Sequence, residues 1–446
     1  MDHSAQGGSS PDWSLVGCDI ISNGEALSVH FLSASFTFHA QWLDDARCDH
    51  GPSRTALSAF CQKPAVARIL KTHTNREGAG VTIDVNWLDG SVSSFPAIWL
   101  RIMGPLVGEP GKASPPLPTW QSRGWLTDSL KIPSFDYKAI FTGTAQTCEA
   151  TAVSIMDEIL MAPNTGIVKI TGLPAPNIES EREKTNTLVT QVLKQIFGAV
   201  FQHPRRSGEK TFNVASHHEE DSKRAAGLPN YDTSQILLPH VDHAHYQHPI
   251  QVQGWYGLEG ESENTFVSGL QALNTLLEEA PEMFEPLITA PMSVGRVVHY
   301  YDPPLYQGTV DTAVTMYPGT AQVKRIRWHP HLTGSIVAPF DEFRKARAAH
   351  HRLQEIIRRD THQLKVILQP GDLYLWNNFT ILHGRERVLQ VPRTGVGQTV
   401  PEQVVADRYR ALKIGQLRGY LEEKWLVHMP AAQLFHLGEL LHCRSL

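Results

Sequence analysis

The sequence predicts a mainly β protein with flanking helices, in which a small N-terminal β domain precedes a double-stranded β-helix, or jelly roll. Three observations lead to this fold class. Short alternating runs fill residues 15–100, a Pro- and Gly-rich segment follows, and the remaining chain has helical patterns before many strand-like runs. Helices followed by antiparallel strands are typical of two sheets that form an open, helix-flanked barrel. With 446 residues and 49.7 kDa, the chain is long enough for both parts.

The N-terminal part is expected to be a small β domain at residues 13–103, after a disordered stretch at residues 1–12. Strand-like runs with alternating apolar residues cover 26–32, 35–39, 81–87 and 93–99. Asp89-Gly90 stands between two of these runs and predicts a hairpin turn. Residues 104–130 are expected to be a linker, because 104–119 carry five Pro and three Gly.

The second part, residues 131–446, is expected to form the jelly roll. Apolar residues at helical spacing predict helices at 147–160, 184–197 and 270–280, with Ser268 as an N-cap of the last. A long, basic, mostly polar helix is expected at 340–359, with its Lys and Arg on a solvated face. Strands are expected at 166–172, 251–258, 265–267, 293–300, 323–328, 364–368 and 373–376. Residues 203–230 are polar and lack periodicity, which is typical of a long loop over an active site.

Composition excludes several classes of partner. The net charge is −5 and no element carries a stripe of Lys and Arg, so no nucleic acid is expected. No apolar run is long enough for a membrane span, and the polar first ten residues lack the apolar core of a signal peptide. The five Cys are scattered. We expect a cytoplasmic protein with a small-molecule substrate; its assembly stays open, with a homodimer as one expectation.

A candidate metal site follows the apolar run 236–238. His240 and Asp242 are two residues apart, so on a strand they share a face and supply two ligands of a 2-His-1-carboxylate iron(II) site. The chain has 22 His, so such a pair also arises by chance. A rival set of His-x-Glu pairs at 217–220 lies in a polar run without a strand pattern, and the strand context therefore favours His240 and Asp242.

The third ligand is expected to be His383, far downstream. It ends an apolar run and precedes Gly384. In a jelly roll, strands that are distant in sequence can face each other across the barrel mouth. Three protein ligands leave coordination positions open for oxygen and a chelating cosubstrate, as a facial triad requires.

These motifs resemble a known family. Leu238-Pro239-His240-Val241-Asp242, Pro370-Gly371-Asp372, Asn377-Asn378 and Leu382-His383-Gly384-Arg385 are similar to motifs of the iron(II)/2-oxoglutarate oxygenases of the taurine dioxygenase superfamily. More narrowly, the chain resembles the γ-butyrobetaine/trimethyllysine hydroxylase branch, which has a small N-terminal β domain. The segments 38–43 and 95–100 are similar to parts of that domain.

The resemblance implies the cofactors and their residues. His240, Asp242 and His383 would hold Fe(II), with 2-oxoglutarate as cosubstrate and O2 as oxidant. The family places an Arg on a late strand, where it grips the far carboxylate of 2-oxoglutarate; a guanidinium suits a carboxylate. Arg410 fits best and Arg408 second, although a surface cation is the alternative reading of Arg410. Asn264 aligns with a family Thr or Ser that touches the same carboxylate.

Departures from the family pattern bear on zinc and on the substrate. Only Cys48 remains near the family's N-terminal zinc cluster, so no zinc is expected. Asp232, beside Tyr231, stands where the hydroxylases have an aromatic wall around a trimethylammonium group. A carboxylate instead suits an ammonium that donates hydrogen bonds, although Asp232 can also be an ordinary cap. Arg327 or His329 falls where the family binds the substrate carboxylate.

The expected function is oxidation of an unactivated C–H bond in a small amine-bearing, amino-acid-like substrate, with succinate and CO2 as coproducts. Aziridine-type ring closure or desaturation of an amino acid is the first alternative. Hydroxylation of γ-butyrobetaine or trimethyllysine is the second, and a non-catalytic cupin-like binding module is the third. A metal hydrolase is disfavoured because the sequence has no His-Glu-x-x-His helix.

Overall fold

The computed structural model describes residues 14–46, 67–76, 81–107, 109–110, 124–127, 130–160, 165–174, 182–201, 212–216, 236–298, 305–317, 322–386 and 393–417. These residues divide into two compact units. One unit takes in the described part of 1–118 and of 410–446, and the other takes in the described part of 119–409. Within these ranges, no helix is both long enough and apolar enough to cross a membrane.

The N-terminal unit is built from two small antiparallel sheets. The first has the order β1 (Leu15–Ile21), β2 (Ala26–Phe31), β3 (Ser35–His39), β7 (Glu109–Pro110). The second has the order β4 (Ile69–Asn75), β5 (Thr82–Trp87), β6 (Val92–Pro96). Helices α1 (Ala40–Ala46) and α2 (Ala97–Val107) complete it. The alternating apolar side chains of the strands form one core that includes Leu27, Phe38, Ile83, Phe95 and Trp99. The small β domain is therefore confirmed.

Two details of this unit differ from the sequence-based expectation. The strand predicted at 93–99 ends at Pro96, and α2 begins at Ala97. This helix continues into the Pro/Gly-rich segment as far as Val107, and β7 then pairs with β3. The hairpin at Asp89-Gly90 is confirmed: Gly90 has a φ of 86°, which favours glycine, and Ser91 N donates to Asp89 Oδ1 at 2.9 Å. Residues 1–12 and Cys48 lie outside the described residues.

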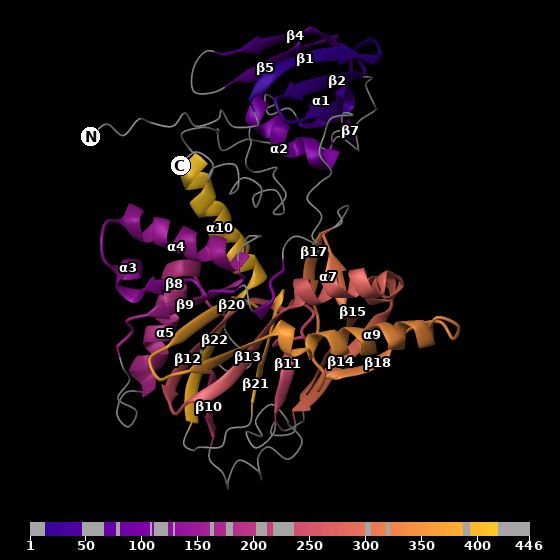
Figure 1. The fold of residues 1–446 in the computed structure, drawn as a ribbon. Coiled ribbons are helices and arrows are strands. Elements are labelled where there is room, and N and C mark those ends of the chain that lie inside the picture. The colour runs from indigo at the N-terminus through magenta and orange to yellow at the C-terminus, as the bar shows by residue number, and fades with distance from the viewer. Residues whose placement is uncertain are drawn as a thin grey trace, which may run out of the picture. The chain divides into compact units, whose positions relative to one another are not determined.

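The larger unit contains a jelly roll of two sheets (Figure 1). The six-stranded sheet has the order β10 (Phe212–Ser216), β22 (Arg393–Pro401), β12 (Ile250–Glu259), β20 (Leu373–Asn377), β9 (Ile167–Thr171), β8 (Ser134–Asp136). The four-stranded sheet has the order β11 (Leu237–His240), β21 (Ile381–Arg385), β13 (Ser262–Ser268), β19 (Gln363–Leu368). Neighbouring strands are antiparallel except β8 and β9.

Further strands extend the barrel beyond the four-stranded sheet. A three-stranded sheet has the order β15 (Leu305–Thr312), β14 (Pro291–Val298), β18 (Thr333–Ile336). A separate pair joins β16 (Val314–Met316) and β17 (Val323–Ile326). Residues 327–328, predicted to continue a strand, lie beyond the end of β17. The predicted loop at 203–230 was also partly wrong, because β10 lies within it and pairs with β22.

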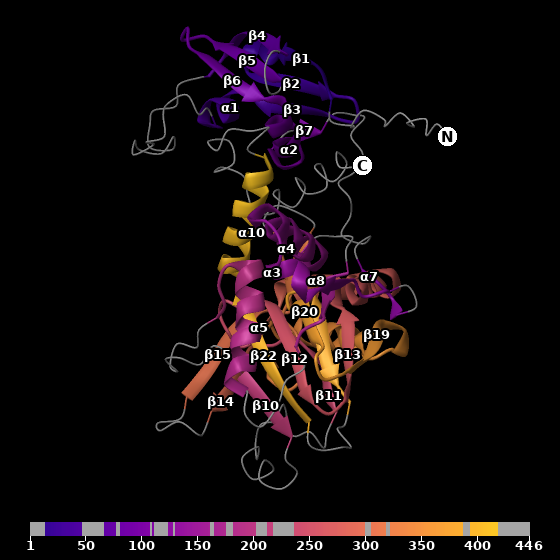
Figure 2. The ribbon, with the colours of Figure 1, turned by 90° about the vertical axis from the view of Figure 1, so that its left-hand side faces the viewer.

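Helices cover both sides of this unit. On the six-stranded sheet lie α3 (Tyr137–Phe141), α4 (Ala145–Leu160) and α5 (Arg182–Phe197), and Figure 2 shows α5 along β22 and β12. On the other side lie α7 (Gly269–Glu279), α8 (Phe284–Thr289) and α9 (Phe343–Ile357). The chain continues after β22 into α10 (Glu402–Leu417). Ser268 Oγ accepts from Gln271 N at 3.2 Å, which confirms the predicted N-cap of α7.

The space between the two sheets is filled by aromatic and aliphatic side chains. Phe266 on β13 meets Trp376 on β20 edge to face, with ring centroids 5.4 Å apart. Trp376 also contacts His383 on β21, at a centroid distance of 4.9 Å. Such offset aromatic pairs add stabilisation beyond the burial of apolar area. This packing fixes the distance between the sheets at the level where the candidate metal ligands begin.

Candidate active site

His240 and His383 are direct cross-strand partners. His240 is the last residue of β11, and its register partner on the antiparallel strand β21 is His383. Their ring centroids lie 4.4 Å apart. The two imidazoles are therefore neighbours within one sheet, rather than residues that face each other across the barrel mouth as expected from the sequence. The register of β11 shifts between Leu237 and His240, so the strand carries a bulge just before the ligand.

Asp242 reaches these imidazoles from a turn, not from a strand. Strand β11 ends at His240, so the predicted strand alternation does not place Asp242. Its Oδ1 lies 3.4 Å from Nε2 of His240, and its Oδ2 lies 3.7 Å from Nε2 of His383. The next residue, His243, has a φ of 57°, the left-handed conformation that turns the chain away. The three predicted ligands thus converge, although the local structure differs from the prediction.

Asn378 holds the backbone of Asp242 in this turn. Its Oδ1 accepts from Asp242 N at 2.9 Å, and its Nδ2 donates to the carbonyls of Asp242 and Ile250, each at 2.9 Å. Asn378 is 1% exposed and follows β20. One side chain therefore satisfies three buried backbone groups, which fixes the position of the turn.

Gln253 holds the carboxylate itself. Its Nε2 donates to Oδ2 of Asp242 at 2.6 Å from β12, in the opposite sheet. The side chain is 2% exposed, so the hydrogen bond is shielded from water. Partners of this kind orient a metal-binding carboxylate and are part of most metal sites.

Gly384, between His383 and Arg385, allows β11 to approach β21. A Cβ built on Gly384 would lie 2.6 Å from the carbonyl oxygen of Leu237 and 3.1 Å from the nitrogen of Pro239. Both are backbone atoms of β11, which cannot move aside without moving His240. The glycine in the His-Gly-Arg motif is therefore required by the close pairing of the two ligand strands.

The electrostatics of the three residues suit a metal ion. Burial raises the pKa of Asp242, but the hydrogen bonds and charges of His240 and His383 hold it well below its usual value. Burial and the neighbouring His240 lower the pKa of His383. Near neutral pH the site therefore offers the ionised carboxylate of Asp242 and the neutral imidazole of His383, which are the forms that bind metals.

His329 also lies among the metal donors. The nearest ligand atoms of His240, Asp242 and His329 all lie within 4.8 Å of one another. The His329 and His240 ring centroids are 4.5 Å apart, and His329 is 1% exposed. Burial and His240 lower the pKa of His329 well below its usual value, so the ring is neutral near neutral pH. His329 was expected from the sequence to bind the substrate carboxylate; the structure places it beside the metal site.

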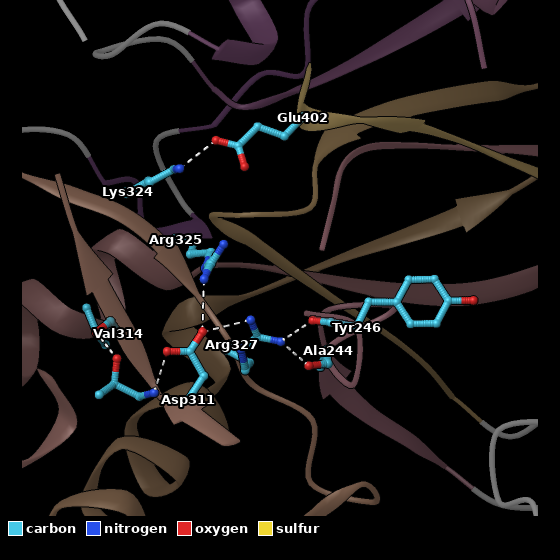
Figure 3. Close-up of polar contacts among 9 residues, drawn as sticks. Ala244, Tyr246, Asp311, Val314, Lys324, Arg325, Arg327 and Glu402 are labelled. Carbon is cyan, nitrogen blue, oxygen red and sulfur yellow. Dashed lines mark hydrogen bonds and ion pairs between the residues drawn. The ribbon is translucent and has the colours of Figure 1, made fainter. Parts of the chain in front are cut away.

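Arg327 is engaged by the protein itself (Figure 3). Its guanidinium donates to the carbonyl of Ala244, to the carbonyl of Tyr246 at 2.8 Å and to Oδ2 of Asp311 at 2.8 Å. Arg325 shares the same carboxylate oxygen at 2.9 Å. Arg327 is 1% exposed, and its contacts tie the turn that carries Asp242 to β15. These partners favour a positioning role over the expected contact with a substrate carboxylate.

Asn264 lies on β13 beside the ligand strand. Its register partner on β21 is Arg385, a buried residue two positions after His383 and on the same face of the strand. Its Nδ2 donates to the carbonyl of Ser262 at 2.9 Å and to Ser262 Oγ at 2.8 Å. A buried amide and a buried guanidinium therefore lie side by side, close to the metal ligands.

The placement of Arg408 and Arg410 on a late strand was wrong. Both residues lie in α10, after the end of β22. Arg408 packs against Gly198 at the end of α5, where a Cβ on the glycine would lie 3.6 Å from its Cδ. Arg410 groups with the N-terminal unit. The late strand of the barrel is β22, and its first residue is Arg393. The sequence pattern did not predict β22, because Gly395, Gly397 and the polar residues around them lack the alternation typical of a strand.

Two predicted substrate residues, Tyr231 and Asp232, lie outside the described residues, as do the rival pairs at 217–220. Conversely, no role was predicted for Gln253, and Asn378 was identified only as part of a motif. A signal existed for both, because Gln253 is a polar residue within the strand-like run 251–258 and Asn378 separates the apolar run 373–376 from Phe379. Such residues are buried and need a partner.

The donor set fits an iron(II) ion. Two imidazoles and one carboxylate are the ligands of the facial-triad iron sites, and the carboxylate is held by a hydrogen bond from outside the triad. Nδ1 of His240 lies 2.8 Å from the carbonyl oxygen of Leu238, which leaves its Nε2, 3.4 Å from Asp242, for the metal. Nε2 of His383 faces the same carboxylate at 3.7 Å. A jelly roll with this site defines an iron(II)- and 2-oxoglutarate-dependent oxygenase.

Comparison with known proteins agrees with this class. The family model described as "Taurine catabolism dioxygenase TauD, TfdA family" matches residues 158–397, and the chain belongs to this family. Curated relatives include the mitochondrial trimethyllysine dioxygenase of Rattus norvegicus, 24% identical over 384 residues that cover 83% of this chain and 82% of the relative. The Homo sapiens protein of the same name is 23% identical and covers 74% of this chain and 70% of its own length.

Similar solved structures have low sequence identity. An asparagine oxygenase in complex with Fe(II), 3-hydroxyasparagine and succinate has a TM-score of 0.44 and 14% identity, covering 63% of this chain and 96% of its own. The non-heme iron oxygenase OrfP with Fe and α-ketoglutaric acid has a TM-score of 0.42 and 15% identity, covering 57% of this chain and 82% of its own. The protein is an Fe(II)/2-oxoglutarate-dependent dioxygenase that uses O2.

Proposed function

We propose that His240, Asp242 and His383 bind the iron of this oxygenase, and that it oxidises an unactivated C–H bond in a small amine-bearing, amino-acid-like substrate. The observation that carries the ligand set is the convergence of the three side chains, with Asp242 3.4 Å from His240 and 3.7 Å from His383. The iron, when bound with 2-oxoglutarate and O2, supplies the oxidising power, with succinate and CO2 as coproducts.

The protein's own residues orient and shield this centre. Gln253 aims the carboxylate of Asp242, and Asn378 fixes its backbone. Trp376 and Phe266 close the space between the sheets beside His383, which keeps bulk water from that side. The site is therefore rigid on the metal side, so substrate selection belongs to the residues around it.

We further propose that Arg393 binds the far carboxylate of 2-oxoglutarate and that Asn264 contacts the same carboxylate. The family resemblance calls for an Arg on a late strand, and Arg393 is the arginine of β22. Arg408 and Arg410, in α10, lack that strand position. The Arg393→Gln variant is expected to raise the KM for 2-oxoglutarate at least ten-fold, whereas Arg408→Gln and Arg410→Gln leave it near the wild-type value. An unchanged KM in Arg393→Gln would refute this assignment.

The amine preference rests on Asp232, with Tyr231 beside it, at the position of an aromatic wall in the hydroxylases. A carboxylate pairs with an ammonium that has N–H groups and gains less from a trimethylammonium group. The curated relatives named trimethyllysine dioxygenase make trimethyllysine the obvious competitor. Aziridine-type ring closure or desaturation uses the same site and differs in the product.

Two assays test the function. Substrate-dependent succinate release is expected from the wild type and not from His383→Ala. Unchanged turnover in His383→Ala would refute the assignment of His383 as a ligand. No succinate release from the wild type would favour a non-catalytic binding module. Product mass then separates hydroxylation, which adds one oxygen, from ring closure or desaturation, which removes two hydrogens. Lysine turned over in preference to trimethyllysine supports the role of Asp232, and the reverse contradicts it.

The partner, the cellular location and the assembly of the protein remain to be tested. A small-molecule substrate is the proposed partner, and the net charge of −5 gives no electrostatic case for nucleic acid. A cytoplasmic location and a homodimer stay predictions, which fractionation and light scattering would check.

A further inference from the structure

The described part of the site contains one imidazole more than a facial triad needs. His240 has two imidazole neighbours at nearly equal distance, His383 at 4.4 Å and His329 at 4.5 Å between ring centroids. The set whose donor atoms lie within 4.8 Å of one another is His240, Asp242 and His329. Geometry alone therefore places His329 among the residues that could hold a metal ion.

His329 is held in this place by its own segment. Val241, between the two ligands of the motif, donates its N–H to the carbonyl of Trp328 at 2.8 Å. The carbonyl of His329 accepts from Leu332 N and Thr333 N at 3.0 Å each, and from Thr333 Oγ1 at 2.9 Å. The backbone before His329 is thus bonded to the metal turn, the backbone after it is held within its own turn, and the ring is shielded from solvent.

Distances permit His329 to reach the same ion. Donors about 2.1 Å from one metal are about 3 Å apart in adjacent positions and about 4.2 Å apart in opposite ones. The largest separation in the set, at most 4.8 Å, is only slightly wider. Rotation of the His329 side chain would close this difference.

Coordination numbers decide when His329 can bind. An octahedral ion has six positions, of which His240, Asp242 and His383 take three. The chelating 2-oxoglutarate takes two more and O2 needs the last, so no position remains for a fourth protein ligand during turnover. His329 can bind only before the cosubstrate does.

We propose that His329 is a fourth protein ligand of the metal ion when 2-oxoglutarate is absent, and that 2-oxoglutarate displaces it. The proposal rests on the ligand set proposed above. Its consequence is that the resting site holds its metal more tightly and has fewer positions open to O2. The metal becomes accessible to O2 only after the cosubstrate has arrived.

Co(II) binding to the metal-free, full-length protein tests the proposal. Without 2-oxoglutarate, His329→Ala is expected to weaken Co(II) binding ten-fold or more; with saturating 2-oxoglutarate, it should differ from wild type by less than two-fold. His383→Ala should weaken binding in both conditions. His331→Ala is the matched control, because this residue lies on the same turn, 6.1 Å from the His329 ring, and should bind Co(II) like wild type.

The outcomes separate the two proposals. If His329→Ala binds Co(II) with wild-type affinity, or loses affinity equally with and without 2-oxoglutarate, the role of His329 is refuted and the proposed triad is unaffected. Wild-type affinity in His383→Ala overturns the proposed triad. A count of bound imidazoles by pulsed EPR on the Cu(II) form of the wild type needs no variant: three without 2-oxoglutarate and two with it are expected, and two in both conditions refute the displacement.

Discussion

Gln253 donates a hydrogen bond of 2.6 Å to Asp242 across the two sheets of the barrel. The donor lies on β12 of the six-stranded sheet, and the acceptor follows β11 of the four-stranded sheet. The metal site therefore depends on the distance between the sheets. Any change that separates them moves the carboxylate away from the imidazoles.

Loss of this donor should weaken metal binding. The Gln253→Met variant keeps the volume of the side chain and removes the hydrogen bond, and we expect metal affinity to fall about 10- to 100-fold. Titration of the metal-free protein with Co(II) measures the effect. Gln398→Met is the control, since Gln398 is also buried in this sheet but bonds to Thr190. Equal affinities for both variants would show that Gln253 does not orient Asp242.

Removal of the Asn378 side chain should destabilise the whole turn. Asn378→Ala leaves three buried backbone groups without their partner, and we expect the free energy of unfolding to fall by about 3 kcal/mol. Urea unfolding of the metal-free protein measures this change. Asn377→Ala should cost about 1 kcal/mol, because Asn377 Oδ1 accepts one described backbone hydrogen bond, from Phe379 N. If Asn378→Ala lowers the free energy of unfolding no more than Asn377→Ala does, the three hydrogen bonds of Asn378 do not stabilise the turn as expected.

A methyl group at Gly384 should separate the two ligand strands. The Gly384→Ala variant places its Cβ against the backbone of Leu237 and Pro239, so β11 must shift and His240 with it. We expect loss of metal binding even where the variant stays folded. Circular dichroism reports the fold and Co(II) titration reports the site. Gly371→Ala, at a turn with open space around it, should bind metal normally despite its positive φ.

Arg327 variants should affect stability more than substrate affinity. Arg327→Met leaves Asp311 with Arg325 and frees the carbonyls of Ala244 and Tyr246, and we expect about 3 kcal/mol of destabilisation. Thermal unfolding and the KM for substrate are the measurements. A stable Arg327→Met protein with a strongly raised substrate KM would restore the role expected from the sequence.

His245 should make stability depend on pH below neutrality. Burial, and then the nearby charges of Arg296 and His243, lower the pKa of His245 to about 3. Between about pH 6.5 and that value the unfolded chain binds a proton that the folded protein does not. The contribution of a neutral His245 is therefore complete above about pH 6.5 and falls by up to about 1.4 kcal/mol per pH unit on acidification.

The His245→Asn variant tests this dependence. Its free energy of unfolding should fall less than that of wild type between about pH 7 and about pH 5, by up to about 2 kcal/mol. Urea unfolding of the metal-free proteins measures the two slopes. Some slope remains in the variant, because buried His350 and His362 also have lowered pKa values. Identical slopes in both proteins would contradict the prediction.

The elements with a clear period could be predicted from the sequence. Helix α4 and strands β2 and β3 lie where helical spacing or alternation placed them, since each buries one stripe or one face. Strand β20 lies where its continuous apolar run placed it, and it is buried on both faces. Strands such as β10 and β22 could not be predicted, because small and polar residues fill them and their positions depend on pairing with each other.

The candidate site was predictable as residues but not as geometry. His240, Asp242 and His383 were identified from their motifs, and they converge. Strand alternation did not place Asp242, because a turn held by Asn378 does so. His329 was assigned to the substrate, because its distance from His240 depends on contacts between residues far apart in sequence. Only the folded chain contains that information.

The bulge in β11 has one more consequence, for the behaviour of the protein in concentrated solution. Among the described strands, β11 is the edge of its sheet, and edge strands can template aggregation with other chains. Pro239 has no N–H to offer, and the register shift beside it breaks the ladder that a foreign strand would need. The strand that presents the metal ligand is thereby protected from intermolecular pairing.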